Sequence, residues 1–369
     1  PKGEKPYRFN WQTPILLSSH NQDILYMGSE FLHRSMNQGE TWERISGDLT
    51  NGAKEGNVAF GTLTTISESK FQFGLLYVGS DDGKIHVSKD GGASWQLISG
   101  NLPQNLWVSR VAASTHKKER VYATLNGYRN DNFESYAFVS EDFGATWNPI
   151  SNGLTEAVNV IVEDSANENI LYVGTDNGLF ISLDKGITWQ DFSNGMPKVA
   201  VHDAVIQTKV KELIVGTHGR SLYKIDISRV QELTKEVLAK NLHLFKVNDR
   251  TKSDRWGTQN YAWGKPSEPS QTIWFYSNGD GMVNVSITNG AGMIVHAQKV
   301  EAKKGLNSFN FDYSMPKNVA DNWNKKDKNI KLKAAENQKI YLPVGKYKLT
   351  ISQDKSSESK SFEIVNPKK

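Results

Sequence analysis

An eight-residue pattern occurs four times in the first half of the chain and constrains the fold more than any other feature. The pattern is S-x-[DN]-x-G-x-[ST]-W, and its tryptophans are separated by 53, 52 and 42 residues. Spacings of this size are typical of the blades of a β-propeller rather than of a helical solenoid. We call each copy a box; the four boxes are Ser35–Trp42, Ser88–Trp95, Ser140–Trp147 and Ser182–Trp189.

The residue types of the box predict a tight hairpin turn. The Asp or Asn side chain accepts backbone N–H bonds within the turn, and the glycine supplies positive φ. The tryptophan opens the next strand, and we expect all four to be largely buried between blades. Catalytic carboxylates in the boxes are the less favoured interpretation. The turn residues are Asn37, Gly39, Trp42, Asp90, Gly92, Trp95, Asp142, Gly144, Trp147, Asp184, Gly186 and Trp189.

A short apolar segment precedes each box and another follows it, and both are predicted to be strands. An inner strand is expected at the start of each unit. No stretch of this region has helical periodicity. Each unit is therefore predicted to be a sheet of four antiparallel strands. The expected inner strands are Thr13–Ser18, Phe60–Ser67, Val108–Ser114, Asn159–Asp164 and Ala200–Gln207.

The fifth unit lacks a box and ends after three strands, at Ile227. Closed propellers usually complete their last blade with a strand from the other end of the chain. Pro1–Arg8 is too short and too polar to serve well. We therefore expect five blades over residues 9–227 that do not close on themselves, with further blades carried upstream of Pro1 in a longer protein. A complete five-bladed propeller is the alternative.

The pattern changes after residue 228, which we take as the end of the propeller region, 1–228. Residues 229–270 are expected to hold one helix, Val230–Ala239, and a linker. Six strands with polar turns then predict an immunoglobulin-like β-sandwich over 271–369. Within it, the Lys-rich segment Asn318–Gln338 reads as a mobile surface loop. The fold class is thus all-β, with propeller blades followed by a sandwich.

The boxes resemble the Asp-box (BNR) repeats of sialidase-like, sortilin-like and xyloglucanase-like propellers. Nearly the whole chain is similar to the C-terminal region of large bacterial sortilin-like (VPS10-like) proteins described as glycosyl hydrolases. The matching segments are Arg8–Ser18, Arg34–Thr50 and Gly216–Asp226, with Gly305–Asp312 and Leu342–Ile351 matching their FlgD-like sandwich. Asn37 departs from the usual Asp of the box. The resemblance implies an exported protein that is periplasmic, extracellular or associated with the outer membrane. Association with the membrane would be through partner molecules.

Composition excludes several classes of site. The chain has no cysteine, so disulfides and thiolate metal sites are impossible. It has no apolar run of about 18 residues that could span a membrane. No metal, phosphate-loop or nucleophile-elbow motif occurs, so we expect neither metal nor cofactor. Residues 231–369 hold 23 Lys and Arg against 14 Asp and Glu. These lysines are dispersed, which favours a solvated face over nucleic acid or another anionic partner.

Candidate ligand-binding residues lie in turns and on an inner strand, where propellers bind ligands at the channel mouth. Guanidinium, phenol and carboxylate groups around a cleft could hold a peptide carboxylate or a glycan. The alternative is that Arg110 and Arg220 pair with acidic neighbours and join blades. The candidates are Arg110, Tyr128, Arg129, Asp131, His218 and Arg220, and the segment Asn126–Ser135 replaces the usual short hairpin of the third unit.

Two functions of different class remain. The first is an exported module that binds peptide, protein or glycan ligands. The second is a glycoside hydrolase of the sialidase-like or xyloglucanase-like kind, which needs two facing carboxyl groups roughly 5–10 Å apart. Binding is favoured, because the residues that can be recognised are structural.

Overall fold

The computed structural model describes residues 6–56, 60–259, 261, 263–327 and 330–367. The chain divides into two units, Pro1–Gln231 and Glu232–Lys369. The boundary falls close to the predicted end of the propeller region at residue 228. Each unit is described separately below.

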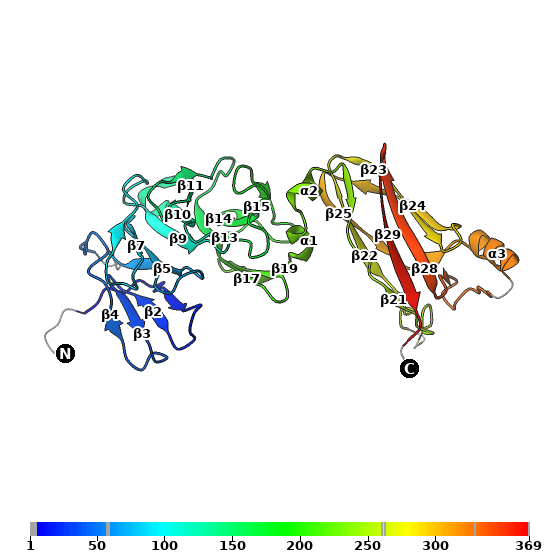
Figure 1. The fold of residues 1–369 in the computed structure, drawn as a ribbon, viewed down its shortest axis with the longest axis horizontal. Coiled ribbons are helices and arrows are strands. Elements are labelled where there is room, and N and C mark those ends of the chain that lie inside the picture. The colour runs from blue at the N-terminus through cyan, green and yellow to red at the C-terminus, as the bar shows by residue number, and fades with distance from the viewer. Residues whose placement is uncertain (1–5, 57–59, 260, 262, 328–329, 368–369) are drawn as a thin grey trace. The chain divides into compact units, whose positions relative to one another are not determined.

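The first unit consists of five antiparallel sheets that follow one another along the chain (Figure 1). Four sheets have four strands and the fifth has three, as the sequence predicted. We call the sheets blades 1 to 5. Blades 1 and 2 contain β1 (Ile15–Leu17), β2 (Leu25–Gly28), β3 (Leu32–Ser35), β4 (Glu43–Arg44), β5 (Leu63–Glu68), β6 (Leu76–Ser80), β7 (Ile85–Ser88) and β8 (Gln96–Leu97).

The remaining blades repeat the same order of strands. Blade 3 is longer at one end, where a 3₁₀ turn joins its second and third strands. After blade 5 the chain forms one short helix, α1 (Ser228–Gln231). These blades contain β9 (Trp107–Ala113), β10 (Val121–Gly127), η1 (Tyr128–Asn130), β11 (Asn132–Ser140), β12 (Asn148–Pro149), β13 (Val158–Glu163), β14 (Leu171–Thr175), β15 (Gly178–Ser182), β16 (Gln190–Asp191), β17 (Val201–Gln207), β18 (Glu212–Thr217) and β19 (Leu222–Asp226).

The four boxes share one hydrogen-bond pattern. In the third box, the carboxylate of Asp142 accepts the backbone N–H of Thr146 at 2.8 Å. The hydroxyl of Ser140 bonds the same carboxylate, and its oxygen accepts the backbone N–H of Gly144. Asn37 accepts the corresponding backbone N–H, from Thr41, at 2.9 Å. Hydrogen bonds, first of all from the Thr146 hydroxyl, lower the pKa of Asp142 to about 2.

The box tryptophans are less buried than predicted. Trp42 is 40% exposed, and Trp95, Trp147 and Trp189 are partly exposed. The reason is geometric: these three indoles lie at the edge of the preceding blade, where each N–H donates to a backbone carbonyl. The bonds run from Trp95 to Ile45 at 3.0 Å, from Trp147 to Ile98 at 2.8 Å and from Trp189 to Ile150 at 2.7 Å.

Blades pack through apolar side chains of their first two strands, and in blades 1, 2 and 4 a glycine on the second strand permits close approach. A Cβ on Gly28 would lie 2.9 Å from Leu63 of blade 2. A Cβ on Gly174 would lie 2.5 Å from Val201 of blade 5. Such contacts are too short for a side chain, so glycine at this position lets the next inner strand approach the sheet.

The two end blades expose faces that neighbouring blades cover elsewhere. Ile15 of blade 1 is 65% exposed, whereas Val111 and Ile161, at the same register in blades 3 and 4, are 1% and 2% exposed. On blade 5, Val205 is 60% and Leu222 is 72% exposed. Among the described residues, no strand pairs with the outer edge of β19 or joins blade 5 to blade 1. Residues 1–5, part of the segment considered as a closing strand, lie outside the described residues.

The second unit is a β-sandwich. A three-stranded sheet, in the order β20-β22-β25, faces a five-stranded sheet, in the order β21-β29-β28-β23-β24, and both contribute to one apolar core. The alternation of apolar residues along the strands predicts eight inward-pointing side chains, of which Phe309 is partly buried and packs against the core. The other seven are buried: Ile273, Phe275, Val283, Val285, Phe311, Tyr347 and Leu349. The strands are β20 (Leu242–Leu244), β21 (Arg250–Thr251), β22 (Gln271–Ser277), β23 (Gly281–Asn289), β24 (Ile294–Ala302), β25 (Gly305–Phe311), β26 (Ser314–Met315), β27 (Ile340–Tyr341), β28 (Gly345–Gln353) and β29 (Ser356–Val365).

The segment expected as one helix and a linker is organised differently. The helix is broken into α1 and α2 (Lys235–Leu238), because the hydroxyl of Thr234 caps a new helix by accepting the backbone N–H of Val237. Part of the expected linker belongs to the sandwich, since β20 pairs with β22 and β21 pairs with β29. Trp256 is buried there against Tyr313 and Tyr341.

The prediction of a loop over Asn318–Gln338 is wrong for its first half. Residues 317–326 form the helix α3 (Lys317–Lys326), in which Ala320 is buried. Val319 and Trp323 pack against the sandwich core. These positions recur at helical spacing, so burying this apolar face stabilises a helix despite its many lysines.

Candidate functional site

The turns between the second and third strands of the five blades lie at the end of the sheet where the inner strands begin. Backbone bonds fix this equivalence: the N–H groups of Asp81, Asp176 and His218 each donate to the residue just before or at the start of an inner strand, at 2.8–3.1 Å. Side chains of these turns therefore gather around the inner strands. We call this end of blades 3 to 5 the rim.

Blade 3 carries an exposed group of aromatic and basic side chains at the rim. The guanidinium of Arg129 lies over the ring of Trp107, with its carbon 4.2 Å from the ring centroid. Tyr128 and Phe133 are 64% and 55% exposed and pack edge to face. No carboxylate forms an ion pair with Arg129 among the described residues, so its donors remain available to a ligand.

A row of polar side chains continues from blade 3 to blade 4. The amide of Asn126 donates to Asn159 at 2.8 Å, and the amide of Asn159 donates to Asp176 at 2.8 Å. In blade 5 the equivalent position holds a histidine pair, His202 and His218, with ring centroids 5.2 Å apart. Partial desolvation, and then the neighbouring His218, lower the pKa of His202.

Arg110 connects two blades that are not neighbours in sequence. Its guanidinium, on β9 of blade 3, lies 2.6 Å from the carboxylate of Asp203 on β17 of blade 5. The Nε atom of Arg110 is buried and has no hydrogen-bond partner among the described residues. An ion pair this exposed adds little stability. The arrangement agrees with the interpretation that Arg110 joins blades.

The structure thus places five of the six predicted ligand residues in the rim turns and one on an inner strand. Tyr128 and Arg129 form η1, and Asp131 follows it in the left-handed conformation, with φ of 53°. His218 contacts His202, whereas Arg220 is exposed and makes no ion pair with a described residue. Sequence reasoning missed Trp107, Asn159, Asp176, His202 and Asp203, although four of them lie in or next to the predicted inner strands.

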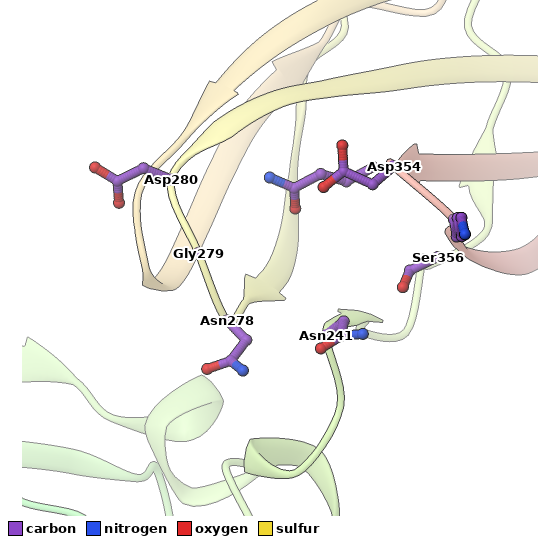
Figure 2. Close-up of a pocket in the computed structure, with 8 residues that line it drawn as sticks. Asn241, Asn278, Gly279, Asp280, Asp354 and Ser356 are labelled. Carbon is purple, nitrogen blue, oxygen red and sulfur yellow. The ribbon is translucent and has the colours of Figure 1, made fainter.

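Two hollows in the surface lie away from the rim. One, of about 430 Å³, lies in the second unit between turns of the sandwich, where Asn278 and Gly279 face Asp354 and Ser356 (Figure 2). Its lining is polar, with amide, carboxylate and lysine side chains. A second, also of about 430 Å³, lies beside the box turn of blade 2 and is lined by Arg34, Ile45, Phe73 and Asp90 to Ala93. Neither contains a predicted ligand residue.

Neither a metal site nor a membrane-spanning helix is found among the described residues. No group of three or more His, Asp or Glu side chains is placed to hold a metal ion there. Within the same residues, none of the helices has the length and apolar character needed to cross a bilayer.

Comparison with known proteins gives a partial family match. Residues 30–157, less than half of the chain, match the Sortilin-Vps10 family (sortilin, neurotensin receptor 3). This segment spans most of blades 1 to 3. No curated protein matches the sequence.

Several solved structures match the chain at low identity, each with a TM-score below 0.5. An ancestral GH74 enzyme matches with 15% identity and a TM-score of 0.47, over 80% of this chain and 39% of its own. The GH74 xyloglucanase from Xanthomonas campestris matches with 12% identity and a TM-score of 0.46, over 93% of this chain and 52% of its own. YCF48 bound to the D1 peptide matches with 13% identity and a TM-score of 0.43, over 62% of this chain and 67% of its own. The chain therefore spans about half or less of the length of each of the two enzymes.

Proposed function

We propose that the propeller unit is a binding module that holds peptide or protein segments at the rim of blades 3 to 5. The observation that carries this proposal is the Arg129 guanidinium, stacked on Trp107 and lacking an acidic partner among the described residues. A guanidinium backed by an indole can form two parallel bonds to a carboxylate. Tyr128 and Phe133 supply exposed apolar surface next to it.

The chemistry of the rim favours a peptide with an acidic group. The row Asn126, Asn159 and Asp176 presents amide and carboxylate groups that can bond a peptide backbone. A ligand whose carboxylate meets Arg129 and whose backbone follows this row would use both features. Glycans that carry a carboxylate would satisfy the same guanidinium, and they form the second class of ligand.

The test is binding of an immobilised library of peptides that contain Asp or Glu, with the amidated library (Asn and Gln in place of the acids) as reference. We expect retention of acidic peptides and at least about tenfold weaker binding by Arg129→Ala, the loss of one charge-assisted contact. Arg44→Ala is the matched control, because Arg44 lies over Phe31 in blade 1 with the same stacking, at 4.6 Å. No retention of acidic peptides, or an equal loss in Arg44→Ala, contradicts the proposal.

A glycoside hydrolase is the second candidate, and one observation favours it: Asp176 and Asp203 lie on neighbouring blades at the rim. Asp203 already forms an ion pair with Arg110, so acid catalysis there requires that this pair opens. Release of reducing sugar from polysaccharides, abolished by Asp203→Asn or Asp176→Asn, would support hydrolysis. Unchanged release in both variants excludes these carboxyls as the catalytic pair.

The exposed apolar faces of blades 1 and 5 lead to a further part of the proposal, which concerns additional blades. Ile15 and Val205 occupy positions that face a neighbouring blade elsewhere in the unit, and Trp42 donates to its own turn rather than to a preceding blade. We propose that additional blades of an exported, longer protein cover these faces. Limited proteolysis and mass analysis of the protein from its natural source test this point, since a chain of only these residues would contradict it.

A further inference from the structure

The hollow beside the box turn of blade 2 lies at the end of the sheets opposite the rim. Box turns join third strands to fourth strands, whereas rim turns join second strands to third strands. The hollow is lined by Arg34 and Ile45 of blade 1 and by Phe73 and Asp90 to Ala93 of blade 2. Its volume of about 430 Å³ is within the range of about 300–1,000 Å³ that ligand pockets have. Phe73 is 43% exposed, so an apolar ring is open to solvent there.

The second box has a glycine at this hollow where the other three boxes have a side chain. The residue after the Asp or Asn of the box is Gln38, Gly91, Phe143 or Lys185. All four have positive φ, between 59° and 75°. Each donates its backbone N–H, at 2.8–3.0 Å, to the carbonyl two residues before the second strand of its blade. The four turns therefore have the same backbone, and only blade 2 lacks a side chain at this position.

The third box shows what fills the corresponding space between blades 2 and 3. Ile98 corresponds to Ile45, because each accepts the indole N–H of the following box. The ring of Phe143 packs against the apolar core cluster that contains Ile98. The ammonium of Lys89 lies 4.3 Å from the centroid of that ring. An aromatic ring beside a cation thus occupies the position that is vacant next to Gly91.

Arg34 supplies a cation at the hollow. It lies opposite Tyr26 in the sheet of blade 1. Blades 2 to 4 have an aliphatic residue at this register, namely Val87, Val139 and Ile181. The guanidinium of Arg34 donates to the carbonyl of Gly91 at 3.1 Å, and its Nε donates to the carboxylate of Glu43 at 2.8 Å. Because Glu43 already neutralises this charge, an anionic ligand gains little, whereas a neutral aromatic ring can still stack on the guanidinium.

We propose that this hollow binds an aromatic side chain of a partner polypeptide. The ring would take the place that Phe143 fills one blade further along, in contact with Phe73 and the guanidinium of Arg34. A polypeptide is the favoured source, because a side chain of this protein's own chain already fills the equivalent space. The site lies at the opposite end of the blades from the rim and does not depend on the function proposed there.

The experiment is saturation-transfer NMR of the full chain with four probes: the N-acetyl amides of phenylalanine, tyrosine and leucine, and phenylacetate. We expect transfer to the rings of the two aromatic amides and weaker transfer to the other two probes. Gly91→Phe should abolish this transfer, because the added ring fills the hollow as Phe143 fills its own space. Phe73→Ala should weaken binding of the aromatic amides about fivefold, the effect of losing one aromatic contact.

The backbone at Gly91 can carry the added side chain. Phe143 has φ of 61° at the same turn position, and an added Cβ on Gly91 would have Arg34 as its nearest neighbour, at 3.7 Å. The thermal midpoint of Gly91→Phe should therefore stay close to that of the wild type. If this variant does not fold, unchanged binding by Phe73→Ala overturns the proposal.

Matched controls separate this hollow from other surfaces. Gln38→Phe places the same ring at the same turn position of blade 1, and Arg129→Ala changes the rim, so both should bind the aromatic amides as the wild type does. Equal transfer in Gly91→Phe and wild type overturns the proposal, as does no transfer to either aromatic amide. Stronger transfer to phenylacetate overturns it in favour of small aromatic acids. A sedimentation coefficient that rises with concentration in the wild type but not in Gly91→Phe overturns it in favour of contact between two copies.

Discussion

Trp147 donates its indole N–H to the backbone carbonyl of Ile98, 2.8 Å away, and so bonds blade 3 to blade 2. Trp42 occupies the same box position in blade 1 but donates to Gly39 of its own turn, at 3.0 Å. We expect Trp147→Ala to lower the free energy of unfolding by about 2–3 kcal/mol, somewhat below the usual cost for a fully buried tryptophan. Trp42→Ala should cost less than about 1 kcal/mol. Urea unfolding of both variants measures the difference, and equal losses would contradict the interblade role.

Equivalent tyrosines in blades 2 and 3 differ in whether their hydroxyls are bonded. The hydroxyl of Tyr122 donates to Glu163 at 2.8 Å, whereas the buried hydroxyl of Tyr77 has no partner among the described residues. Blade 3 holds Ala113 where blade 4 holds Glu163. Tyr122→Phe should therefore lower the free energy of unfolding by about 1–2 kcal/mol, and Tyr77→Phe should leave it unchanged or raise it slightly. Chemical denaturation of the pair tests this, and a larger loss in Tyr77→Phe would show that a water bonds that hydroxyl.

The box carboxylates predict a dependence of stability on pH. The folded-state pKa of Asp142 is lowered to about 2, below the usual value of about 3.9 for an unfolded chain. A lowered pKa stabilises the fold above pH 4, and this contribution is lost as the pH falls from 4 to 2. Asp142→Asn should weaken that dependence, because the amide cannot ionise but can still accept the turn bonds, as Asn37 does. Thermal midpoints measured between pH 5 and pH 2 check this, and Asn37→Asp should do the reverse.

The effect of replacing a glycine on the second strand of a blade depends on whether a neighbouring blade covers that glycine. A Cβ on Gly79 would overlap Val108 of blade 3, so Gly79→Ala should lower the free energy of unfolding by about 1–3 kcal/mol. Gly216 is the equivalent residue of blade 5, and its nearest neighbour would lie 3.6 Å from an added Cβ. In this chain, Gly216→Ala should be neutral or stabilising by up to about 1 kcal/mol. A destabilising effect in a longer natural chain would reveal a covering blade.

The candidate site shows how far sequence reasoning could reach. Tyr128 and Arg129 stand out in the sequence because their segment, Asn126–Ser135, replaces the short hairpin expected from the repeat. His218 stands out because it lies in the equivalent turn of the fifth unit. The other members, such as Asn159 and Asp176, lie 33 and 50 residues from Asn126 in sequence, and only the packing of adjacent blades brings them into one hydrogen-bonded row. Their residue types alone are ordinary for strand ends and turns.

The sequence by itself determined the repeated units, because the Ser, Asp and Gly of each box make bonds within the turn and need no distant partner. It also determined the six sandwich strands β22 to β25, β28 and β29, whose alternating apolar residues face the core whatever their pairing. Tertiary structure decided how deeply Trp147 is buried, that the hydroxyl of Tyr122 donates to Glu163, and that Arg110 forms its ion pair with Asp203. It also decided that residues 317–326 form a helix against the sandwich core. These outcomes depend on contacts between segments that are distant in sequence, and local periodicity carries no information about such contacts.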